Sequence, residues 1–419
     1  MSWRKISVAG HKFEVARTTL GLGGQGKVYR ARRADTKHPA IFKTMPTSAE
    51  AEQRLRWLVD QRLGQILPQV AAPLAWKEHQ GELAYIAALA NGVPLDEDRP
   101  RTFPERLELV WILSCLWSRL ETAGIAHGDV APSNIMIMPN GWADLIDLDN
   151  YVTQDPLNPA PSMIGQHPMM APELRMARNA GQPIPPTIES DRFAWAVLFS
   201  LLLFYRHPTD GQIDGTPASF DAAMTSGIWP ERNRAAQAGE TPMAAVGEPL
   251  AKLFDGAFSL QQGNRPNAAA WRVVLGQSLK AMVRHRCGQV FVGTSARTCP
   301  WCGAAIQMPT VHGDQLTIRV RNIDTGREAA YMLSRGRGLM LGRDTIPDAT
   351  AYVSGRHLEL VIVGQDLRLV SHGRNGTTVT LGQTPRQSLN RLATALPGSK
   401  LDGAVLDVAN TRIELRIGR

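Results

Sequence analysis

Residues His127–Asn134 have the sequence HGDVAPSN, and Asp147 follows thirteen positions after Asn134. This part of the chain supplies two carboxylates, on Asp129 and Asp147, and one carboxamide, on Asn134. Transfer of a phosphoryl group needs one side chain that orients the attacking hydroxyl and oxygen ligands that hold magnesium against the phosphates. We therefore predict that Asp129 is the catalytic group and that Asn134 and Asp147 bind Mg2+.

Two upstream segments carry groups that suit phosphate. Gly21–Val28 (GLGGQGKV) is rich in glycine, which lets backbone N–H groups approach phosphate oxygens closely. Ala40–Lys43 (AIFK) is an apolar run that ends in a lysine, whose ammonium can pair with phosphates. Lys43 resembles the strand lysine of protein kinases, which implies a role in catalysis and nucleotide binding. The predicted nucleotide-binding residues of the loop are Gly21, Gly23, Gly24, Gly26 and Val28.

In chain order, these segments resemble the eukaryotic-like Ser/Thr protein kinases. The resemblance covers residues 1–280 and continues through Met170–Glu173 (MAPE), Ser190–Trp195 (SDRFAW) and Gly263–Pro266 (GNRP). Several ordered matches are far less accidental than one motif. The resemblance implies an α+β, bilobal protein kinase fold that holds ATP and Mg2+.

The resemblance also implies a carboxylate on a helix that pairs with Lys43. Thr47–Glu50 (TSAE) is a capping-box pattern, with Thr47 as the predicted N-cap. Glu50 then lies in the first turn, where it interacts with the helix dipole. We therefore predict Glu52 as the partner of Lys43, with Glu50 and Asp60 as alternatives.

Two positions depart from the kinase pattern. Gly128 stands where most kinases carry the arginine that contacts a phosphorylated activation segment, which argues against control through that contact. Asp149 stands where kinases carry glycine after the metal-binding aspartate. Asp149 either adds a metal ligand or stiffens the segment.

Three further residues are implied to support the site without taking part in chemistry. The family counterparts of Glu173 and Arg265 form a buried ion pair. Asp191 is expected to hold the backbone of the catalytic loop through hydrogen bonds.

Three cysteines and a histidine fall close together after residue 280: His285, Cys287, Cys299 and Cys302. The segment Cys299–Cys302 (CPWC) is a knuckle that presents two thiolates to zinc. We predict a structural Cys3His zinc site within residues 281–303, in which a ligand from elsewhere in the chain can replace His285. The alternatives are free thiols or a disulfide between Cys299 and Cys302, and cytosolic proteins rarely keep structural disulfides.

The sequence changes in character from residue 314, after a linker at residues 304–313. Short alternating runs such as Leu316–Val320 and His357–Ile362 are separated by glycine-rich turns, which predicts an all-β sandwich. Residues 314–419 resemble a forkhead-associated (FHA) domain, the phosphothreonine-binding module. Leu341–Arg343 (LGR), Ser354–His357 (SGRH) and Asn375–Thr377 (NGT) carry this resemblance.

The FHA resemblance implies residues that bind a phosphopeptide. Arg343 and Ser354 are predicted to contact the phosphate, which calls for charge-assisted donors, and Asn375 to position the peptide backbone. Arg356 is a further candidate, displaced by one position from the family pattern. His357 is predicted to pack and hydrogen-bond within the loop. The alternative is a sandwich that binds unphosphorylated partners.

Composition agrees with a multidomain globular protein. The chain has 419 residues, of which 43% are hydrophobic, enough for two large domains and a small zinc unit. The net charge of +8 is scattered without a basic cluster among aromatics, so we predict no nucleic-acid partner. The apolar run Phe193–Phe204 is too short to span a bilayer, and the N-terminus lacks the apolar core of a signal peptide. We expect a cytoplasmic protein without a membrane partner.

The whole arrangement resembles bacterial kinases of the tellurite-resistance-associated phosphorylation triad. Pro73–Trp76 (PLAW), Leu145–Asn150 (LIDLDN) and Cys299–Cys302 carry this narrower resemblance. It implies a metal-dependent protein phosphatase and a von Willebrand A-type protein as partners. The FHA resemblance implies a phosphothreonine-containing protein, which can be a second copy of this chain.

Three functions are consistent with these features. The first is an active Ser/Thr protein kinase that also phosphorylates itself, with Thr153 as a candidate site because it is the only threonine between Asp147 and Glu173. The second is a nucleotide-binding pseudokinase scaffold that acts through the FHA domain. The third is a small-molecule phosphotransferase, since the HGD motif also resembles aminoglycoside kinases. The segments around Glu173 and Arg265, and the attached phosphopeptide module, favour a protein substrate.

Overall fold

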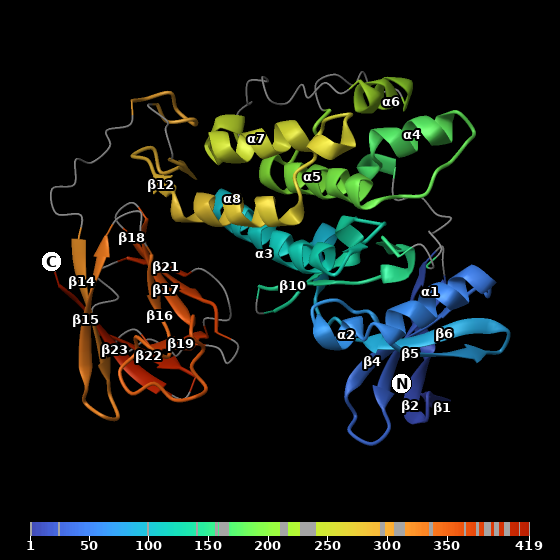
Figure 1. Cartoon of the computed structure of the whole chain (residues 1–419), viewed down its shortest axis with the longest axis horizontal. Helices are drawn as coiled ribbons and strands as arrows, with labels where there is room; N and C mark the ends of the chain where they lie inside the picture. The colour runs from blue at the N-terminus through green and yellow to red at the C-terminus, as the bar shows by residue number, and fades with distance from the viewer. Residues whose placement is uncertain are drawn as a thin grey trace.

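The chain has mixed α/β content, and helices and sheets alternate along it in three regions (Figure 1). We call them the N-terminal sheet (residues 2–98), the helical region (residues 100–293) and the C-terminal β-region (residues 315–418). The computed structural model describes residues 2–23, 26–98, 100–139, 141–155, 158, 167–209, 217–226, 240–293, 298–305, 315–334, 338–363, 366–373, 377–380, 387–388, 394–397, 403–409 and 411–418.

Six antiparallel strands form the N-terminal sheet, in the order β1-β2-β3-β4-β6-β5. Its core contains the buried side chains of Val15, Phe42 and Ile86. Helix α1 packs against strand β5, and the short helix α2 follows it. The bounds are β1 (Trp3–Val8), β2 (His11–Gly23), β3 (Gly26–Arg33), β4 (Pro39–Met45), β5 (Pro73–His79), β6 (Glu82–Ala88), α1 (Ala49–Asp60) and α2 (Leu63–Ile66).

The N-cap of α1 lies one residue after the predicted N-cap, Thr47. Ser48 is the cap, because its hydroxyl accepts a hydrogen bond from the Ala51 N–H at 3.1 Å. Thr47 instead donates its hydroxyl to the Gly81 carbonyl at 2.9 Å, which ties the helix entrance to the β5–β6 turn. The capping-box pattern therefore indicates the helix correctly but misplaces its first residue.

The helical region is built around helices α3 and α5. A capping box of Thr102 and Glu105 starts α3, as expected for a polar N-cap three residues before a glutamate. Trp117 of α3 stacks on Trp195 of α5 with ring centroids 5.5 Å apart, and both are fully buried. The bounds are α3 (Phe103–Thr122), α4 (Pro172–Asn179), α5 (Ile188–Phe204), α6 (Pro217–Thr225), α7 (Glu248–Ala257) and α8 (Ala268–Lys280).

Short strands position the motifs near Asp129 and Asp147. Strand β9 (Ile135–Ile137) pairs antiparallel with β10 (Ala143–Leu145) and with β7 (Val93–Pro94), and β8 (Ile125–Ala126) pairs with β11 (Val152–Thr153). The register sets Leu145 opposite Ile135, and the Ile146 N–H donates to the Asn134 carbonyl at 3.0 Å. The two loops that carry the predicted site therefore leave the same end of these ladders.

A hairpin of β12 (Met282–Arg284) and β13 (Val290–Val292) follows α8, and then come the two sheets of the C-terminal β-region. One sheet has the order β15-β14-β23-β22-β19-β20 and the other β16-β17-β18-β21. Both contribute to one core, which includes Ile318 and Leu406 from the first and Leu358 and Leu369 from the second. The bounds are β14 (Gln315–Asn322), β15 (Glu328–Ser334), β16 (Leu339–Leu341), β17 (Leu358–Val363), β18 (Asp366–Ser371), β19 (Thr377–Thr380), β20 (Gln387–Ser388), β21 (Thr394–Pro397), β22 (Ala404–Val408) and β23 (Thr411–Gly418).

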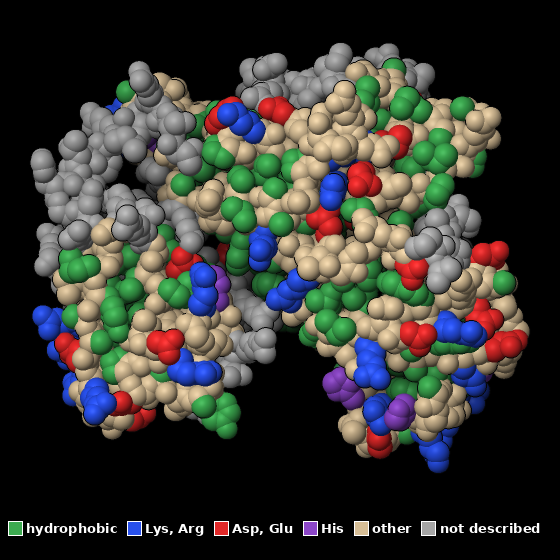
Figure 2. Space-filling model, viewed as in Figure 1, with side chains coloured by type: hydrophobic (Ala, Val, Ile, Leu, Met, Phe, Trp, Pro, Cys, Tyr) green, Lys and Arg blue, Asp and Glu red, His purple; other side chains and the backbone are tan. Residues whose placement is uncertain are grey.

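The C-terminal β-region lies beside α3 and α8 (Figure 1). Val361 of β17 joins the core of the helical region. A cavity of about 710 Å3 remains nearby, lined by residues that include Leu63, Trp111 and His372, and Figure 2 shows the molecule hollowed on this side. On the same face, acidic and basic side chains are interspersed.

None of the described helices combines the length and apolar character needed to cross a bilayer.

Candidate active site

Lys43 of β4 connects the N-terminal sheet to the loop that follows β10. Its Nζ forms ion pairs with Asp147 and with Asp149, the latter at 2.7 Å from Oδ2. Lys43 is only 5% exposed. Burial opposes its charge, but the carboxylates of Asp149 and Asp147 outweigh that effect and raise the pKa of Lys43. The ammonium therefore stays charged at neutral pH.

Asp149 is the more enclosed of the two carboxylates. Its side chain is 5% exposed, against 33% for Asp147. Its Oδ1 accepts a hydrogen bond from the Tyr85 hydroxyl at 2.9 Å. Burial raises the pKa of Asp149, and the ion pair with Lys43 opposes that shift. Neither Asp149 nor Tyr85 was predicted as a partner of Lys43.

The predicted partner of Lys43, Glu52, is corrected by the structure. Its side chain is 39% exposed and accepts from Arg56 Nη2 at 2.8 Å, one helical turn further along α1. Spacing along the helix made Glu52 plausible, but the orientation of α1 points this residue to solvent. Of the alternatives, Glu50 and Asp60 are exposed as well.

The structure brings Asp129 and Asn134 together in the loop that ends in the 3-10 helix η2 (Pro132–Asn134). The Asn134 amide nitrogen donates to the Asp129 carbonyl at 2.8 Å and to Asp129 Oδ2 at 3.2 Å. This orientation leaves the amide oxygen of Asn134 available to a cation. Asp147, the other predicted magnesium ligand, follows Ile146, whose N–H binds the Asn134 carbonyl.

His127 connects the segment that contains Asp129 to the segment after β10 through its two ring nitrogens. Its Nδ1 accepts from the Asp129 N–H at 3.3 Å, so Nε2 carries the ring proton and donates to the Ile146 carbonyl at 2.9 Å. Asp191 of α5 accepts from the backbone N–H groups of His127 at 3.2 Å and Gly128 at 2.9 Å. Burial raises the pKa of Asp191, while His127 and these N–H groups oppose that shift. Asp191 therefore holds the backbone at His127 and Gly128, as the kinase resemblance implies.

Gly128, the first departure from the kinase pattern, has a steric explanation. Its φ is +75°, and a Cβ at this position would lie 1.9 Å from the Asn150 carbonyl oxygen. No side chain fits there without a shift of the backbone, because the chain after Asp147 passes too closely.

Helix α1 contacts the segment after β10 through the guanidinium of Arg54. Arg54 Nη2 donates to the carbonyls of Asp149 at 2.6 Å and Tyr151 at 2.8 Å, and its guanidinium lies 4.5 Å from the centre of the Tyr151 ring. Trp57 stacks on the same ring at 5.3 Å. Sequence reasoning missed Arg54; the available signal was its place beside Leu55 on the buried face of α1.

The glycine-rich segment includes the end of β2 and the start of β3, and β3 pairs with the strand that carries Lys43. Val28 is directly opposite Lys43 in the β3–β4 register. A Cβ on Gly26 would lie 1.9 Å from the Thr44 carbonyl oxygen, whereas Gly21 faces open space. Gly23 ends β2, and Gly24 lies outside the described residues.

The structure also brings Glu173 and Arg265 together. Arg265 binds both oxygens of the Glu173 carboxylate, each at 2.7 Å, and donates to the Glu189 carbonyl at 2.9 Å. Its side chain is fully buried. This bidentate pair connects α4, α5 and the segment before α8.

The chain is similar in sequence to several serine/threonine-protein kinases. The chain is 25% identical over 257 residues to the serine/threonine-protein kinase PknH of Mycobacterium tuberculosis (strain CDC 1551 / Oshkosh), covering 54% of this chain and 40% of that protein. It is 28% identical over 167 residues to the serine/threonine-protein kinase PknE of Mycobacterium bovis, covering 38% and 30%. It is 25% identical over 190 residues to the serine/threonine-protein kinase UCNL of Arabidopsis thaliana, covering 41% and 46%.

These similarities support a eukaryotic-like protein kinase at the level of the family. The chain spans less than half the length of these curated relatives. No protein-family profile matches it.

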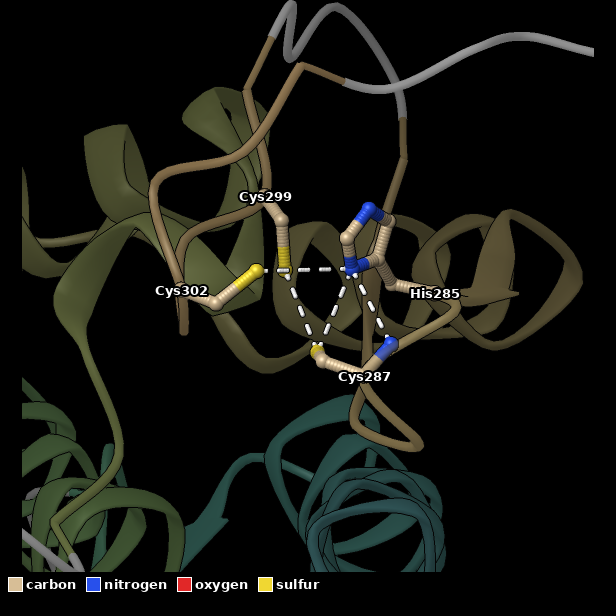
Figure 3. A group of neighbouring side chains, drawn as sticks. All are labelled: His285, Cys287, Cys299 and Cys302. Atoms are coloured by element: carbon tan, nitrogen blue, oxygen red, sulfur yellow. Dashed lines mark hydrogen bonds between the residues drawn. The ribbon is translucent and has the colours of Figure 1, made fainter.

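The predicted zinc ligands form one cluster after the kinase-like part (Figure 3). The ligand atoms of His285, Cys287, Cys299 and Cys302 all lie within 4.8 Å of one another. His285 Nδ1 is 3.2 Å from Cys287 Sγ and 3.5 Å from Cys302 Sγ, and the sulfurs of Cys287 and Cys299 are 3.8 Å apart. The three cysteines form no disulfide, so the alternative Cys299–Cys302 bridge is absent. This cluster can bind a metal.

The predicted phosphopeptide residues of the C-terminal β-region have different surroundings. Arg343 is exposed, and its guanidinium donates to the carbonyls of Val353 at 3.1 Å and Ala351 at 3.0 Å, so it also braces the following loop. Ser354 follows that loop and is half-buried. Asn375 lies outside the described residues.

His357 and Arg356 face in different directions. His357 is fully buried, and its Nδ1 accepts from the Ser354 N–H at 3.1 Å. A Cβ on Gly373 would lie 2.1 Å from His357 Nε2, so the ring is tightly packed. Arg356 lines a cavity of about 310 Å3 together with Arg272 of α8, on the side facing the helical region.

Proposed function

We propose that this chain is a Ser/Thr protein kinase that transfers the γ-phosphoryl group of ATP to protein hydroxyls. The observation that carries the proposal is the convergence of Lys43 from the sheet with Asp147, next to the Asn134–Asp129 pair. These are the ammonium, two carboxylates and one carboxamide that the reaction requires. Transfer forms a bond from the substrate oxygen to the γ-phosphorus and breaks the bond to the β-phosphate, so that ADP leaves.

Each of these groups has a defined task in the proposed reaction. Lys43 binds the α- and β-phosphates, and backbone N–H groups of the glycine-rich segment bind phosphate oxygens. Asp129 orients the hydroxyl and takes its proton. Position and charge neutralisation supply most of the rate.

The residues present fit a magnesium ion. Mg2+ prefers oxygen ligands, and the Asn134 amide oxygen and the Asp147 carboxylate would hold it. When bound, the ion neutralises the charge of the phosphates.

The decisive experiment uses the full chain with labelled ATP, magnesium and a generic protein acceptor. Asp129→Asn and Lys43→Ala are expected to lower phosphate incorporation by at least about a thousandfold. Incorporation at the wild-type rate in both variants would contradict the assignment. Mapping the labelled residues also tests Thr153 as an autophosphorylation site.

A nucleotide-binding pseudokinase is the second candidate, and one observation favours it. The Lys43 ammonium is paired with the carboxylates of Asp147 and Asp149, whereas the kinase reaction needs it to bind phosphate. This reading predicts that the chain binds ATP without incorporating phosphate into any acceptor. A small-molecule phosphotransferase is disfavoured by the Glu173–Arg265 pair, which resembles the platform of protein-substrate kinases.

We further propose that the His/Cys cluster is a structural zinc site. In a tetrahedron with Zn–S distances of about 2.3 Å, two sulfurs are about 3.8 Å apart, which matches the separation of Cys287 and Cys299. All four positions are filled by protein ligands, which is typical of structural zinc.

The C-terminal β-region is proposed to be an FHA-type phosphothreonine module that recruits partners or substrates. Its two-sheet core and the exposed Arg343 support this reading. The proposed partners are a phosphothreonine-containing protein, a metal-dependent phosphatase and a von Willebrand A-type protein. Binding of phosphothreonine and threonine forms of one peptide, compared in wild type and Arg343→Ala, tests the module.

A further inference from the structure

Asp149 has no role in the phosphoryl-transfer scheme, although it contacts the central lysine. Asp147 is one-third exposed and is needed for magnesium, so its oxygens cannot remain committed to Lys43. Both oxygens of Asp149 are engaged by protein groups: Oδ2 by Lys43 at 2.7 Å and Oδ1 by the Tyr85 hydroxyl at 2.9 Å. Asp149 is thus a partner that Lys43 keeps when Asp147 turns to the cation.

Helix α1 does not supply a carboxylate to this lysine. Glu52 pairs with Arg56 at the surface, whereas Arg54 is a charged residue that α1 directs inward, beside the buried Leu55. Arg54 binds the carbonyl of Asp149 itself at 2.6 Å. The helix therefore contributes a cation that binds the loop backbone, and the loop contributes the carboxylate of Asp149 that pairs with Lys43.

We propose that Asp149 is the positioning residue that holds Lys43 for phosphate binding, and that Arg54 couples the position of α1 to it. A buried ammonium without a partner is strongly unfavourable, so Lys43 needs one permanent carboxylate. Tyr85 fixes the carboxylate from the sheet, and Arg54 fixes its backbone from the helix. This inference rests on the proposed kinase function.

The first test separates nucleotide binding from acceptor binding in steady-state kinetics. Asp149→Asn preserves the size of the side chain and is expected to raise the KM for ATP by at least about tenfold while leaving the KM for the acceptor within about twofold. Glu52→Gln, the matched control on α1, is expected to change both KM values by less than about twofold.

Tyr85→Phe removes only the hydroxyl that fixes Asp149 and is expected to raise the KM for ATP by a smaller factor than Asp149→Asn does. Should Asp149→Asn fail to fold, this variant decides the question. An effect of Glu52→Gln that equals or exceeds those of Asp149→Asn and Tyr85→Phe would overturn the proposal.

The second test does not depend on turnover. Melting temperatures are measured for Lys43→Met, Asp149→Asn and the double variant, and in parallel for Lys43→Met with Glu52→Gln. We expect the Lys43 and Asp149 shifts to be non-additive by about 3 °C or more, and the Lys43 and Glu52 shifts to be additive. Additive Lys43 and Asp149 shifts would refute the pairing. A wild-type chain that incorporates no phosphate would instead refute the kinase function, while this cycle still decides the pair.

Discussion

Gly128 illustrates how one residue is determined by a neighbour that is remote in the sequence. Its backbone adopts a positive φ, and the Asn150 carbonyl occupies the space of a side chain. The kinase resemblance expects arginine at this position, and the structure shows that none fits. A side chain at position 128 is therefore excluded for a steric reason.

We predict that Gly128→Ala lowers stability and phosphate incorporation together. Gly124→Ala is the matched control, because Gly124 also has a positive φ of +71° but nothing within 4 Å of a Cβ. The control should cost about 1 kcal/mol through backbone strain alone, and Gly128→Ala more than about 2 kcal/mol. Thermal unfolding and labelled ATP measure both effects. Equal losses in the two variants would show that the Asn150 contact is unimportant.

Asp144 on β10 provides a pH-dependent prediction. Burial raises the pKa of Asp144 from 3.8 to about 6. The folded chain therefore keeps a proton that the unfolded chain releases near pH 4, so this group lowers stability as the pH rises from about 4 to about 6. At pH 7.5, Asp144→Asn should melt about 2 °C above the wild type. At pH 3.5 or below, the two proteins should melt at the same temperature. A difference that does not change with pH would contradict this account.

At the scale of elements, helix α1 and the loop after β10 form one unit. Arg54, Trp57 and Tyr151 connect them through hydrogen bonds and stacked rings. The Tyr151 hydroxyl returns a hydrogen bond to the Arg54 carbonyl at 2.9 Å. Any displacement of α1 therefore disturbs the segment that carries Asp147 and Asp149.

We predict that Arg54→Ala reduces both stability and catalysis, because it leaves two enclosed carbonyls without their donor. The expected loss of stability is about 2 kcal/mol, and the KM for ATP should rise. Arg56→Ala on the same helix should cost less than about 1 kcal/mol, since Arg56 is exposed, pairs with Glu52 and lies 5.6 Å from the centre of the Trp76 ring. Melting curves and initial rates of the two variants provide the comparison. A larger effect of Arg56→Ala would show that α1 is held mainly from its outer face.

At the scale of the whole molecule, the His/Cys cluster is attached to the helical region. Trp301, between two of the cysteines, donates to the Val290 carbonyl at 3.0 Å, and its ring meets Phe103 at the start of α3. Cys299 is buried in the same core as α3 and α8. The cluster therefore supports the end of the helical region and is not an independent appendage.

We predict about one zinc ion per chain in the purified protein, measured by elemental analysis. Removal by a strong chelator should lower the melting temperature, because metal-binding free energy is part of the folding free energy at such sites. Cys302→Ser should lose the metal, whereas Cys115→Ser, outside the cluster, should retain it. A full metal content in Cys302→Ser would refute the assignment.

The candidate site residues could be proposed from the sequence because they sit in local motifs. The spacing of Asp129, Asn134 and Asp147, and the knuckle at Cys299–Cys302, are properties of short segments whose backbone geometry is nearly self-contained. The kinase resemblance and the mixed α/β content followed from those motifs, and the relatives support the kinase family.

Only the tertiary structure decided which charges meet. Lys43 and Asp147 are separated by 104 positions, and Arg54 lies 95 positions from the backbone carbonyl of Asp149 that it binds, so no periodicity relates either pair. Glu52 was a reasonable choice for Lys43 by helical spacing, but the packing of α1 rotated Glu52 to solvent and turned Arg54 inward. Ion pairs between distant segments depend on how helices and sheets pack, and packing is set by the sum of many buried contacts that no single motif encodes.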